Sequence, residues 1–557
     1  MQNTSNPQEM TGGMAIVEAL ITNGVDNLFG IPGAQMYSFF DALQQRSDSI
    51  RTYGARHEQT CGYMAFGYAR STGKPGVFSV VPGPGVLNAS AAMLTALGCS
   101  APVLCVTGQV PAAFIGKWRG HLHEMPDQLG TLRSFTKWSE RIERVEDAPE
   151  IVNEAFRQML IGRPGPVAIE MAWDTMASRA KVQRLPGARI PRPSAPLQQQ
   201  IEAAAKILVN AKRPMIMVGS GAQHASAAVL ALAEELDASV SALRGGRGIV
   251  SEGHELGVSN HVAYRLWPET DALVGIGTRL EVPYMRWTGI MNFIDKPEAP
   301  PHLIRIDIDP EEMNRLVPHA PVVADSERGT LALLESVRRL KSANLEASKE
   351  RRERIAKTKA SANAEVQKVQ PQLKFLEVIR EVLPHDGIFV GELSQMGFAS
   401  YFGYPVYEPR TYISEGFQGT LGAGFPTALG VKVAHPDKPV VSVTGDGGFM
   451  FAVQELATAA HEGIGLVTLL FNNKAFGNVL RDQKVGFENR IIGSALKNPD
   501  FQKLAEAFGI RSYRVTSPET LRPVLAAAIK AGTACLIEVD VERGSEVSPW
   551  EFINPPR

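Results

Sequence analysis

Short apolar runs alternate with longer segments of helical spacing along most of the chain. The runs are rich in Val, Ile and Leu and are bounded by Gly, Pro or Asp. Such runs are typical of strands buried on both faces of a parallel sheet. The segments between them, such as 451–463, have apolar residues at helical spacing and a polar face, as in helices that cover a sheet. The clearest runs are 102–107, 214–219, 271–277, 302–309, 438–447 and 465–473.

Two breaks divide this pattern into three blocks. Residues 182–200 are rich in proline, which fixes φ and lacks an amide donor, so they predict an extended linker. The stretch from about 341 to 372 is polar and dense in charge, which predicts a solvated helix or tether. We therefore predict an α/β protein with three doubly wound parallel-sheet domains. Their expected ranges are 1–185, 195–345 and 370–557.

The composition excludes several functional classes. Lys and Arg number 57 against 58 Asp and Glu, and this balance argues against a general nucleic-acid-binding protein. The 4 cysteines form no CxxC pair, so neither a disulfide framework nor a structural zinc site is expected. No apolar run approaches the roughly 18 residues of a membrane span, and the N-terminus lacks a signal-peptide profile. We expect a soluble, cytoplasmic protein without a nucleic-acid or membrane partner.

Polar residues follow two neighbouring runs of the third block. One run ends in Gly445-Asp446-Gly447-Gly448 and the next ends in Asn472-Asn473. Open parallel sheets bind ligands at the carboxyl ends of their strands. Glycines let backbone amides approach an anion closely, while the side chains of Asp and Asn offer the hard oxygen ligands that suit Mg²⁺. The pattern predicts a diphosphate held through Mg²⁺.

This segment resembles the diphosphate-binding signature of thiamine diphosphate (ThDP) enzymes, which runs from GDG to NN. RHEQTCGYMAFGYAR (56–70), VVPGPGVLNA (80–89) and PVLCVTGQVP (102–111) resemble the pyrimidine-binding domain of that family. The middle block resembles its central nucleotide-fold domain. The resemblance covers nearly the whole chain, in the domain order of pyruvate oxidase and acetolactate synthase, and acetolactate synthase is the more similar. It implies a pyrimidine-binding, a central and a diphosphate-binding domain.

The resemblance also implies roles for individual residues. Glu58 matches the family's glutamate on the coenzyme's aminopyrimidine, and we expect it to be buried, which would keep a proton available. Within GFQGTLGAGFPTALG (416–430), Leu421 matches the residue under the bend of the coenzyme, and Gly419 the carbonyl that accepts from its 4′-amino group. The implied Mg²⁺ ligands are the side chains of Asp446 and Asn473 and the backbone oxygen of Ala475. The other implied coenzyme-binding residues are Ser394, Gln395, Gly445, Gly447, Gly448 and Gly477. The family more often has Ser than Gly after GDG.

The substrate side departs from acetolactate synthases. Their Phe-Gln-Glu segment is missing from loop 114–132, which resembles the loop of benzaldehyde lyase and places His123 near that enzyme's active-site glutamine. His123 would then donate or accept a proton at a substrate hydroxyl. An ordinary surface histidine is the alternative, and a metal pair with His121 lacks an evident third ligand. We also assign Gly33 and Ala34 to the substrate side.

A second departure lies in 476–490, which has no tryptophan where acetolactate synthases select their second substrate. Asp482 falls near that position. Arg481 or Lys484 would recognise a substrate carboxylate, or else both are simply solvated. Strict acetolactate synthesis is therefore not required by the sequence.

The expected activity is decarboxylation of a 2-oxo acid, followed either by attack of the enamine on a second carbonyl compound or by its protonation. Alternatives are an oxalyl-CoA decarboxylase or 2-hydroxyacyl-CoA lyase and a pyruvate oxidase with working FAD. A silent subunit is disfavoured because Glu58 and the metal ligands are present. GSGAQH (219–224) is not a full dinucleotide fingerprint, so the central domain is open to FAD, to ADP or to no ligand. The family fold implies a homodimer as the minimum and favours a homotetramer.

Overall fold

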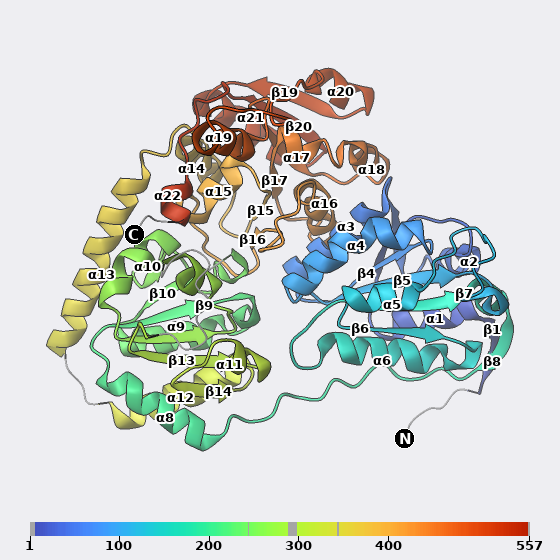
Figure 1. Cartoon of the computed structure of the whole chain (residues 1–557), viewed down its shortest axis with the longest axis horizontal. Helices are drawn as coiled ribbons and strands as arrows, with labels where there is room; N and C mark the ends of the chain where they lie inside the picture. Colours follow the sequence, from blue (N-terminus) through green and yellow to red (C-terminus); the bar gives the residue numbers. More distant parts are fainter. Residues whose placement is uncertain (1–5, 243, 288–297, 342–344, 555–557) are drawn as a thin grey trace.

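The computed structural model describes residues 6–242, 244–287, 298–341 and 345–554. Three six-stranded parallel sheets are each packed with helices, and a two-stranded antiparallel ribbon joins β1 (Gln8–Thr11) to β8 (Arg179–Val182) (Figure 1). The prediction of an α/β protein with three doubly wound domains is confirmed. No described helix is both long enough and apolar enough to cross a membrane.

The N-terminal sheet has the strand order β3-β2-β4-β5-β7-β6. Its strands are β2 (Asn27–Gly30), β3 (Arg51–Gly54), β4 (Gly76–Val80), β5 (Val103–Gln109), β6 (Trp138–Ile142) and β7 (Val167–Ala172). Its helices are α1 (Gly12–Thr22), α2 (Tyr37–Gln45), α3 (Glu58–Thr72), α4 (Pro84–Gly98), α5 (Gln128–Ser134), α6 (Ala148–Leu160) and α7 (Trp173–Ala177).

The central sheet has the order β11-β10-β9-β12-β13-β14. Its strands are β9 (Pro214–Val218), β10 (Ser239–Ala242), β11 (Gly257–Val258), β12 (Ala272–Ile276), β13 (His302–Asp307) and β14 (Ala320–Val323). Its helices are α8 (Gln198–Asn210), α9 (Ser226–Leu236), α10 (Asn260–Leu266), α11 (Glu311–Arg315) and α12 (Ser326–Leu340). The polar stretch that follows is the long helix α13 (Leu345–Val366), at the left edge of Figure 1.

The C-terminal sheet has the order β16-β15-β17-β18-β20-β19. Its strands are β15 (Ile388–Gly391), β16 (Tyr412–Ile413), β17 (Val440–Gly445), β18 (Val467–Asn472), β19 (Arg511–Val515) and β20 (Cys535–Asp540). Its helices are α14 (Gln372–Val382), α15 (Gln395–Gly403), α16 (Gly424–Ala434), α17 (Asp446–Phe449), α18 (Leu456–His461), α19 (Gly477–Gly486), α20 (Phe501–Ala507), α21 (Pro518–Ala531) and α22 (Trp550–Ile553).

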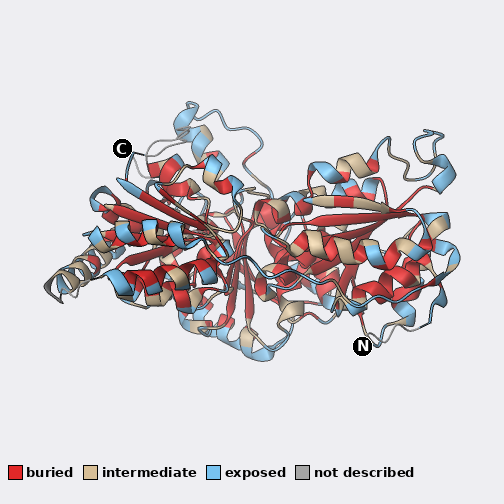
Figure 2. Ribbon diagram, turned by 90° about the horizontal axis from the view of Figure 1, so that it is seen from below, coloured by how far each residue is buried: buried red, intermediate tan, exposed pale blue. Residues whose placement is uncertain are grey.

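All six apolar runs form strands, namely β5, β9, β12, β13, β17 and β18. Their residues are almost entirely buried, as Figure 2 shows for the strands of the three sheets. Burial on both faces is the reason that these strands carry continuous apolar sequence instead of alternation.

The N-terminal and C-terminal domains share one hydrophobic core, because α3 packs directly against α16. Two glycines allow this close approach. A Cβ at Gly67 would lie 2.1 Å from the carbonyl oxygen of Thr427, and one at Gly430 would lie 2.0 Å from that of Met64. The central domain has a separate core.

Candidate active site

Asp446 and Asn473 lie together at the carboxyl edge of the C-terminal sheet. Asp446 directly follows β17, and Asn473 follows β18, which pairs with β17. The Asp446 side chain is 1% exposed and accepts a hydrogen bond from Asn498 Nδ2 at 2.6 Å. It also interacts with the backbone amide of Asn473. Sequence reasoning missed Asn498, because it lies in an irregular segment that no motif marks.

Glu546, from the tail after β20, also reaches this edge and was missed by sequence reasoning. Its Oε2 accepts a hydrogen bond from Asn473 Nδ2 at 2.5 Å. The Nδ2 of Asn473 is therefore occupied, and its Oδ1, which accepts from the Ala475 amide at 3.1 Å, is the remaining oxygen. Burial raises the pKa of Glu546 to about 7, and the nearby Asp446 adds to that rise. Burial also raises the pKa of Asp446.

The ligand set at this edge fits Mg²⁺. Among the described residues, no three His, Cys, Asp or Glu side chains are grouped so that they could hold a metal ion. A cation would instead take the carboxylate of Asp446, the amide oxygen of Asn473 and a backbone oxygen such as that of Ala475. Few protein ligands, all of them oxygen, with room for phosphate and water, are typical of Mg²⁺ sites.

Glycines and an unpartnered amide surround the same edge. A Cβ at Gly447 would lie 2.5 Å from the Phe476 ring, and one at Gly477 would lie 2.8 Å from Asn473 Nδ2. Gln395 follows Ser394, the N-cap of α15, and lies beside Gly477. Its Oε1 is buried and has no hydrogen-bond partner among the described residues. Glycines without side chains and an unused polar group fit a ligand that approaches the backbone closely here.

Gly419 and Leu421 lie in the loop 416–422, which approaches the same edge. Gly419 adopts a positive φ of 64°, and Leu421 is half-buried. The loop is held by Glu392, which directly follows β15 and accepts a hydrogen bond from the Gly422 amide at 2.5 Å and another from the Thr444 hydroxyl. Glu392 is buried, and this raises its pKa to about 7. Sequence reasoning missed Glu392, although its place after a buried strand is the signal that marked Asp446.

Gly448 lies beside the same carboxyl group. A Cβ there would lie 2.6 Å from Glu392 Oε1 and 2.9 Å from Oε2. The serine that ThDP enzymes more often have after GDG would therefore collide with Glu392. Gly445, the remaining glycine of the motif, would place a Cβ 3.1 Å from the Cβ of Ser394.

Glu58 opens α3 in the N-terminal domain, after the N-cap residue His57. Its Oε2 accepts a hydrogen bond from Asn88 Nδ2 at 3.0 Å. The single chain leaves Glu58 half-buried, so it does not provide the full burial that we expected. The face of Glu58 that this chain leaves open is free for a ligand or a second chain.

His123 lies close to Glu58 and is hydrogen-bonded to Gln35. His123 Nδ1 is 2.7 Å from Gln35 Oε1. Burial lowers the pKa of His123, and the charge of Glu58 opposes that change. Gly33 and Ala34 precede Gln35 and are half-buried, and a Cβ at Gly33 would meet Val81 at 2.5 Å. The sequence analysis named the two residues before Gln35 but not Gln35 itself.

Arg481 and Asp482 lie on α19. Arg481 donates to Ser548 Oγ at 2.7 Å and to Asn478 Oδ1 at 2.6 Å, and it forms an ion pair with Asp482 at 2.8 Å. These contacts hold the guanidinium within the protein, whereas the side chain of Asp482 is 58% exposed. Of these two residues, Asp482 is therefore the more accessible to solvent.

Within one chain, Glu58 and the loop 416–422 contact α4 at positions that are far apart along this helix. Asn88 contacts Glu58, while Thr95 Oγ1 is 3.4 Å from Thr420 Oγ1, and a Cβ at Gly98 would be 3.0 Å from Gln418. A rise of 1.5 Å per residue separates Asn88 from Thr95 by about 10 Å along the helix axis.

A cavity of about 450 Å³ lies between the N-terminal and central domains and is bordered by Ser220, Gly221, Gly277 and Asp307. Burial raises the pKa of Asp307 to about 6. The glycines here serve packing between loops, because a Cβ at Gly219 would lie 2.3 Å from the carbonyl oxygen of Gly277.

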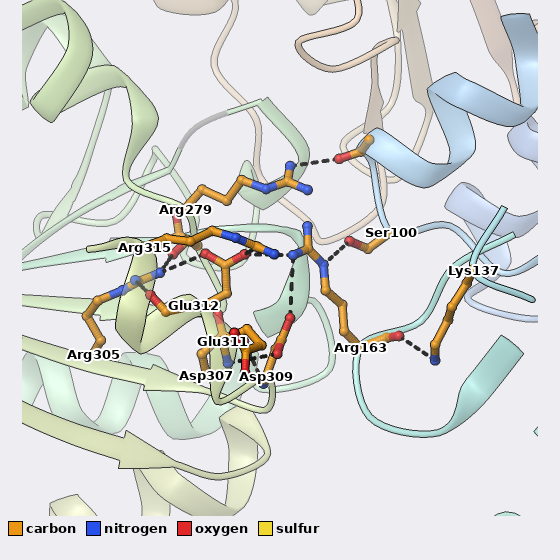
Figure 3. Close-up of polar contacts among 12 residues, drawn as sticks. Ser100, Lys137, Arg163, Arg279, Arg305, Asp307, Asp309, Glu311, Glu312 and Arg315 are labelled. Atoms are coloured by element: carbon orange, nitrogen blue, oxygen red, sulfur yellow. Dashed lines mark hydrogen bonds and ion pairs between the residues drawn. The ribbon is translucent and has the colours of Figure 1, made fainter. Parts of the chain in front are cut away.

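Arginines fasten the two domains around this cavity (Figure 3). Arg163 binds Glu312 at 2.6 Å and Ser100 at 2.8 Å, and Arg279 donates to the carbonyl of Gly98 at 2.7 Å. Asp309 lies 3.7 Å from Arg163. The cavity is therefore a fixed feature of the domain boundary.

Comparisons with known proteins show which family this chain belongs to. Residues 10–131, 201–334 and 390–539 match the N-terminal TPP binding domain, the central domain and the C-terminal TPP binding domain of thiamine pyrophosphate enzymes. A probable acetolactate synthase large subunit of Methanocaldococcus jannaschii is 33% identical over 560 residues, covering 96% of this chain and 92% of that protein. The chain belongs to the thiamine pyrophosphate enzyme family.

Two further relatives are similar to this chain to about the same extent. A probable 2-ketoarginine decarboxylase of Pseudomonas aeruginosa is 33% identical over 549 residues, covering 96% of this chain and 94% of that protein. The acetolactate synthase large subunit of Haemophilus influenzae is 31% identical over 568 residues, covering 98% and 97%. This chain is therefore a ThDP-dependent enzyme, thiamine pyrophosphate being another name for ThDP.

Proposed function

We propose that this enzyme uses ThDP and Mg²⁺ to decarboxylate a 2-oxo acid and to join the product to a second carbonyl compound. The observation that carries the proposal is the oxygen-rich edge of Asp446 and Asn473, in a chain that resembles acetolactate synthase large subunits over nearly its full length.

The residues of this chain would bind Mg²⁺, the coenzyme and the substrate in separate groups. Asp446, Asn473 and the backbone of Ala475 would hold Mg²⁺, and Ser394, Gln395, Gly445, Gly447, Gly448 and Gly477 would face the diphosphate. Leu421 would support the bend of the coenzyme, the Gly419 carbonyl would accept from its amino group, and Glu58 would hydrogen-bond its pyrimidine ring. ThDP itself supplies the carbanion chemistry when bound. His123 would handle a proton at the substrate.

The proposal includes a second copy of the chain that completes each site. Glu58 is only half-buried in the single chain, and a second chain would bury it further. Large apolar side chains are also exposed on α4 and around α17, and exposed patches of this kind mark interaction surfaces. They are Leu87, Leu94, Met450 and Phe451. We propose a homodimer as the minimum and a homotetramer as the favoured form.

A second candidate is simple decarboxylation of a basic 2-oxo acid. The relative named a 2-ketoarginine decarboxylase is as similar in identity as the synthase relative of M. jannaschii. The exposed Asp482, where the synthases' tryptophan is missing, pairs with Arg481 through Oδ1 and would offer its other carboxyl oxygen to a cationic side chain. In that case the enamine would be protonated and would not attack a second carbonyl.

The decisive assay incubates the purified protein with ThDP, Mg²⁺ and pyruvate, follows CO₂ release and identifies the product by mass. Formation of acetolactate supports the main proposal. Turnover of 2-ketoarginine to an aldehyde, without turnover of pyruvate, supports the second candidate. A Glu58→Gln variant should abolish either reaction, which provides the control for contaminating activity.

We propose FAD only as a candidate ligand of the cavity between the N-terminal and central domains. The cavity at Ser220 and Asp307 has the volume of a small-molecule site. A visible absorption spectrum of the purified protein would detect bound flavin. If flavin is present, loss of its visible absorbance on addition of pyruvate would show that pyruvate reduces it and would indicate an oxidase. An unchanged spectrum during turnover would indicate a structural role.

A further inference from the structure

The loops that follow β2, β4 and β5 converge around His123. Gln35 follows β2, Gly83 follows β4, and Gly108 is near the end of β5. A Cβ at Gly83 would lie 2.5 Å from the carbonyl oxygen of His123, and one at Gly108 would lie 2.6 Å from that of Gln35. Both backbones are therefore confined by glycines that leave no room for a side chain.

A buried polar network holds these glycines in place. Gln128 Oε1 accepts from the Gly83 amide at 2.7 Å, and Gln128 Nε2 donates to the Gly108 carbonyl at 2.9 Å. The same Nε2 donates to Glu170 Oε2 at 2.7 Å. Gln128 is 1% exposed and Glu170 is fully buried. The position of His123 is thus built into the domain.

The hydrogen bonds of Gln35 fix which way its amide faces. Gln35 Nε2 lies 2.6 Å from the carbonyl oxygen of Leu122, which can only accept, so the amide nitrogen is the donor there. Gln35 Oε1 then faces His123 Nδ1 at 2.7 Å. Because an amide oxygen can only accept, Nδ1 of His123 must carry the proton.

Both partners have an unusual backbone conformation. Gln35 has a φ of 68° and His123 a φ of 65°. Non-glycine residues in this region cost roughly 1–3 kcal/mol each and concentrate at functional sites. The two residues with positive φ are therefore the two partners of one hydrogen bond, and the surrounding structure stabilises both conformations.

We propose that Gln35 is a positioning residue that holds His123 in the Nδ1-protonated tautomer, so that Nε2 is a proton acceptor for a substrate hydroxyl. The inference rests on the proposed function and decides between the two roles, donor and acceptor, that the sequence leaves open. Among the described residues no hydrogen bond occupies Nε2. On accepting the proton, His123 becomes the imidazolium, the hydroxyl oxygen keeps the electron pair, and Nδ1–H stays on Gln35 Oε1.

The test reads the tautomer directly and does not need turnover. Full-length protein with ¹³C- and ¹⁵N-labelled histidine rings is studied by NMR, and the His123 signals are assigned as those that a His123→Asn variant lacks among the 11 histidines. We expect wild-type His123 in the Nδ1–H form. A mainly Nε2–H ring would overturn the proposal.

Two variants separate positioning from folding. Gln35→Asn tolerates the positive φ but is too short to reach both partners, so Nδ1–H should lose its preference. Gln35→Glu keeps an acceptor for Nδ1 and should restore the tautomer. The exposed Gln44 provides the matched control, as Gln44→Asn. An unchanged tautomer in Gln35→Asn would overturn the proposal.

Kinetics provide the second readout. We expect Gln35→Asn to lower kcat about 100-fold, the usual scale of a positioned proton acceptor, while the affinity for ThDP stays within twofold. A comparable loss of ThDP affinity would show a merely structural role and overturn the proposal. Failure of the proposed function would appear differently, as wild-type protein with the expected tautomer but no turnover of a 2-oxo acid.

Discussion

At the scale of single residues, two buried carboxyl groups of the C-terminal domain have pKa values well above the ordinary one. Glu392 and Glu415 are both within the protein, and burial raises the pKa of Glu415 to about 8. Neither carboxyl oxygen of Glu415 is hydrogen-bonded to another residue among those described. Such a group prefers to keep its proton in the folded state.

Glu415 should therefore make stability depend on pH. Its pKa in the folded protein is above the ordinary value of 4.5, so the unfolded chain releases the proton first. Stability should fall as pH rises from about 4.5 to about 8, by a few kcal/mol at roughly 1.4 kcal/mol per pKa unit. Thermal unfolding of coenzyme-free protein at several pH values should show a smaller decline for Glu415→Gln. The exposed Glu408→Gln is the control, and an equal slope in all three proteins would contradict the expectation.

Gly448 and Glu392 should behave as a coupled pair. Gly448→Ser alone would push its Cβ against the Glu392 carboxyl group, and overpacking of this kind costs roughly 1–3 kcal/mol. We expect ThDP affinity, measured by titration of protein fluorescence, to fall about tenfold or more. In a Glu392→Ala background the same serine should cost much less. Purely additive losses in the double variant would rule out the coupling.

At the scale of elements, the strands could be predicted from sequence because each buried run carries its own apolar signal. The edge of Asp446 and Asn473 followed from the rule that ligands meet strand ends. Asn498, Glu546 and Gln35 could not be predicted, because their contacts join segments that are distant in the chain. The burial expected for Glu58 likewise depends on contacts from distant segments or from a second chain, because the apolar residues of α3 bury the helix body while its first turn stays half-buried in the single chain.

The C-terminal tail illustrates such a distant contact. Glu546 binds Asn473, Val547 pairs through its backbone with Gln370, and Ser548 binds Arg481. These contacts fasten the tail across the start of α19. The tail therefore acts as a brace for the proposed metal ligands, although it supplies none of them.

Loss of the Glu546 contact should weaken metal binding. Glu546→Ala frees the amide of Asn473 to rotate, and removal of such a supporting group typically costs 10–100-fold in metal affinity. Titration of Mg²⁺ into ThDP-containing protein, followed by calorimetry, should show this loss. Glu542→Ala, an exposed change in the same tail, should leave the affinity unchanged. Equal affinity in both variants would argue against the brace.

At the scale of the whole molecule, the two halves of the proposed site come from domains at opposite ends of the sequence. Glu58 and His123 belong to the N-terminal domain, and Asp446 and Asn473 to the C-terminal domain. The shared core between α3 and α16 fixes these domains within one chain. A second copy, related by a twofold axis, would bring the other half of each site.

Mixed dimers would test this arrangement. Glu58→Gln and Asp446→Ala chains should each be inactive alone. If sites form between chains, each mixed dimer contains one intact site, and a random mixture should recover about a quarter of wild-type activity. Co-expression with two different affinity tags would isolate the mixed species. No recovery in that species would show that each site lies within one chain.

The largely exposed linker 183–197 is the long connection along the lower side of Figure 1, and it touches the N-terminal domain at Ala188, whose amide donates to Asn23 Oδ1 at 2.9 Å. The N-terminal domain is held to the rest by Arg163, Arg279 and the α3–α16 core, none of which depends on that connection. The peptide link is therefore dispensable once the parts have met. The gene could be divided there, with one product ending after β8 and the other beginning at α8. The two co-expressed polypeptides should assemble into a working enzyme.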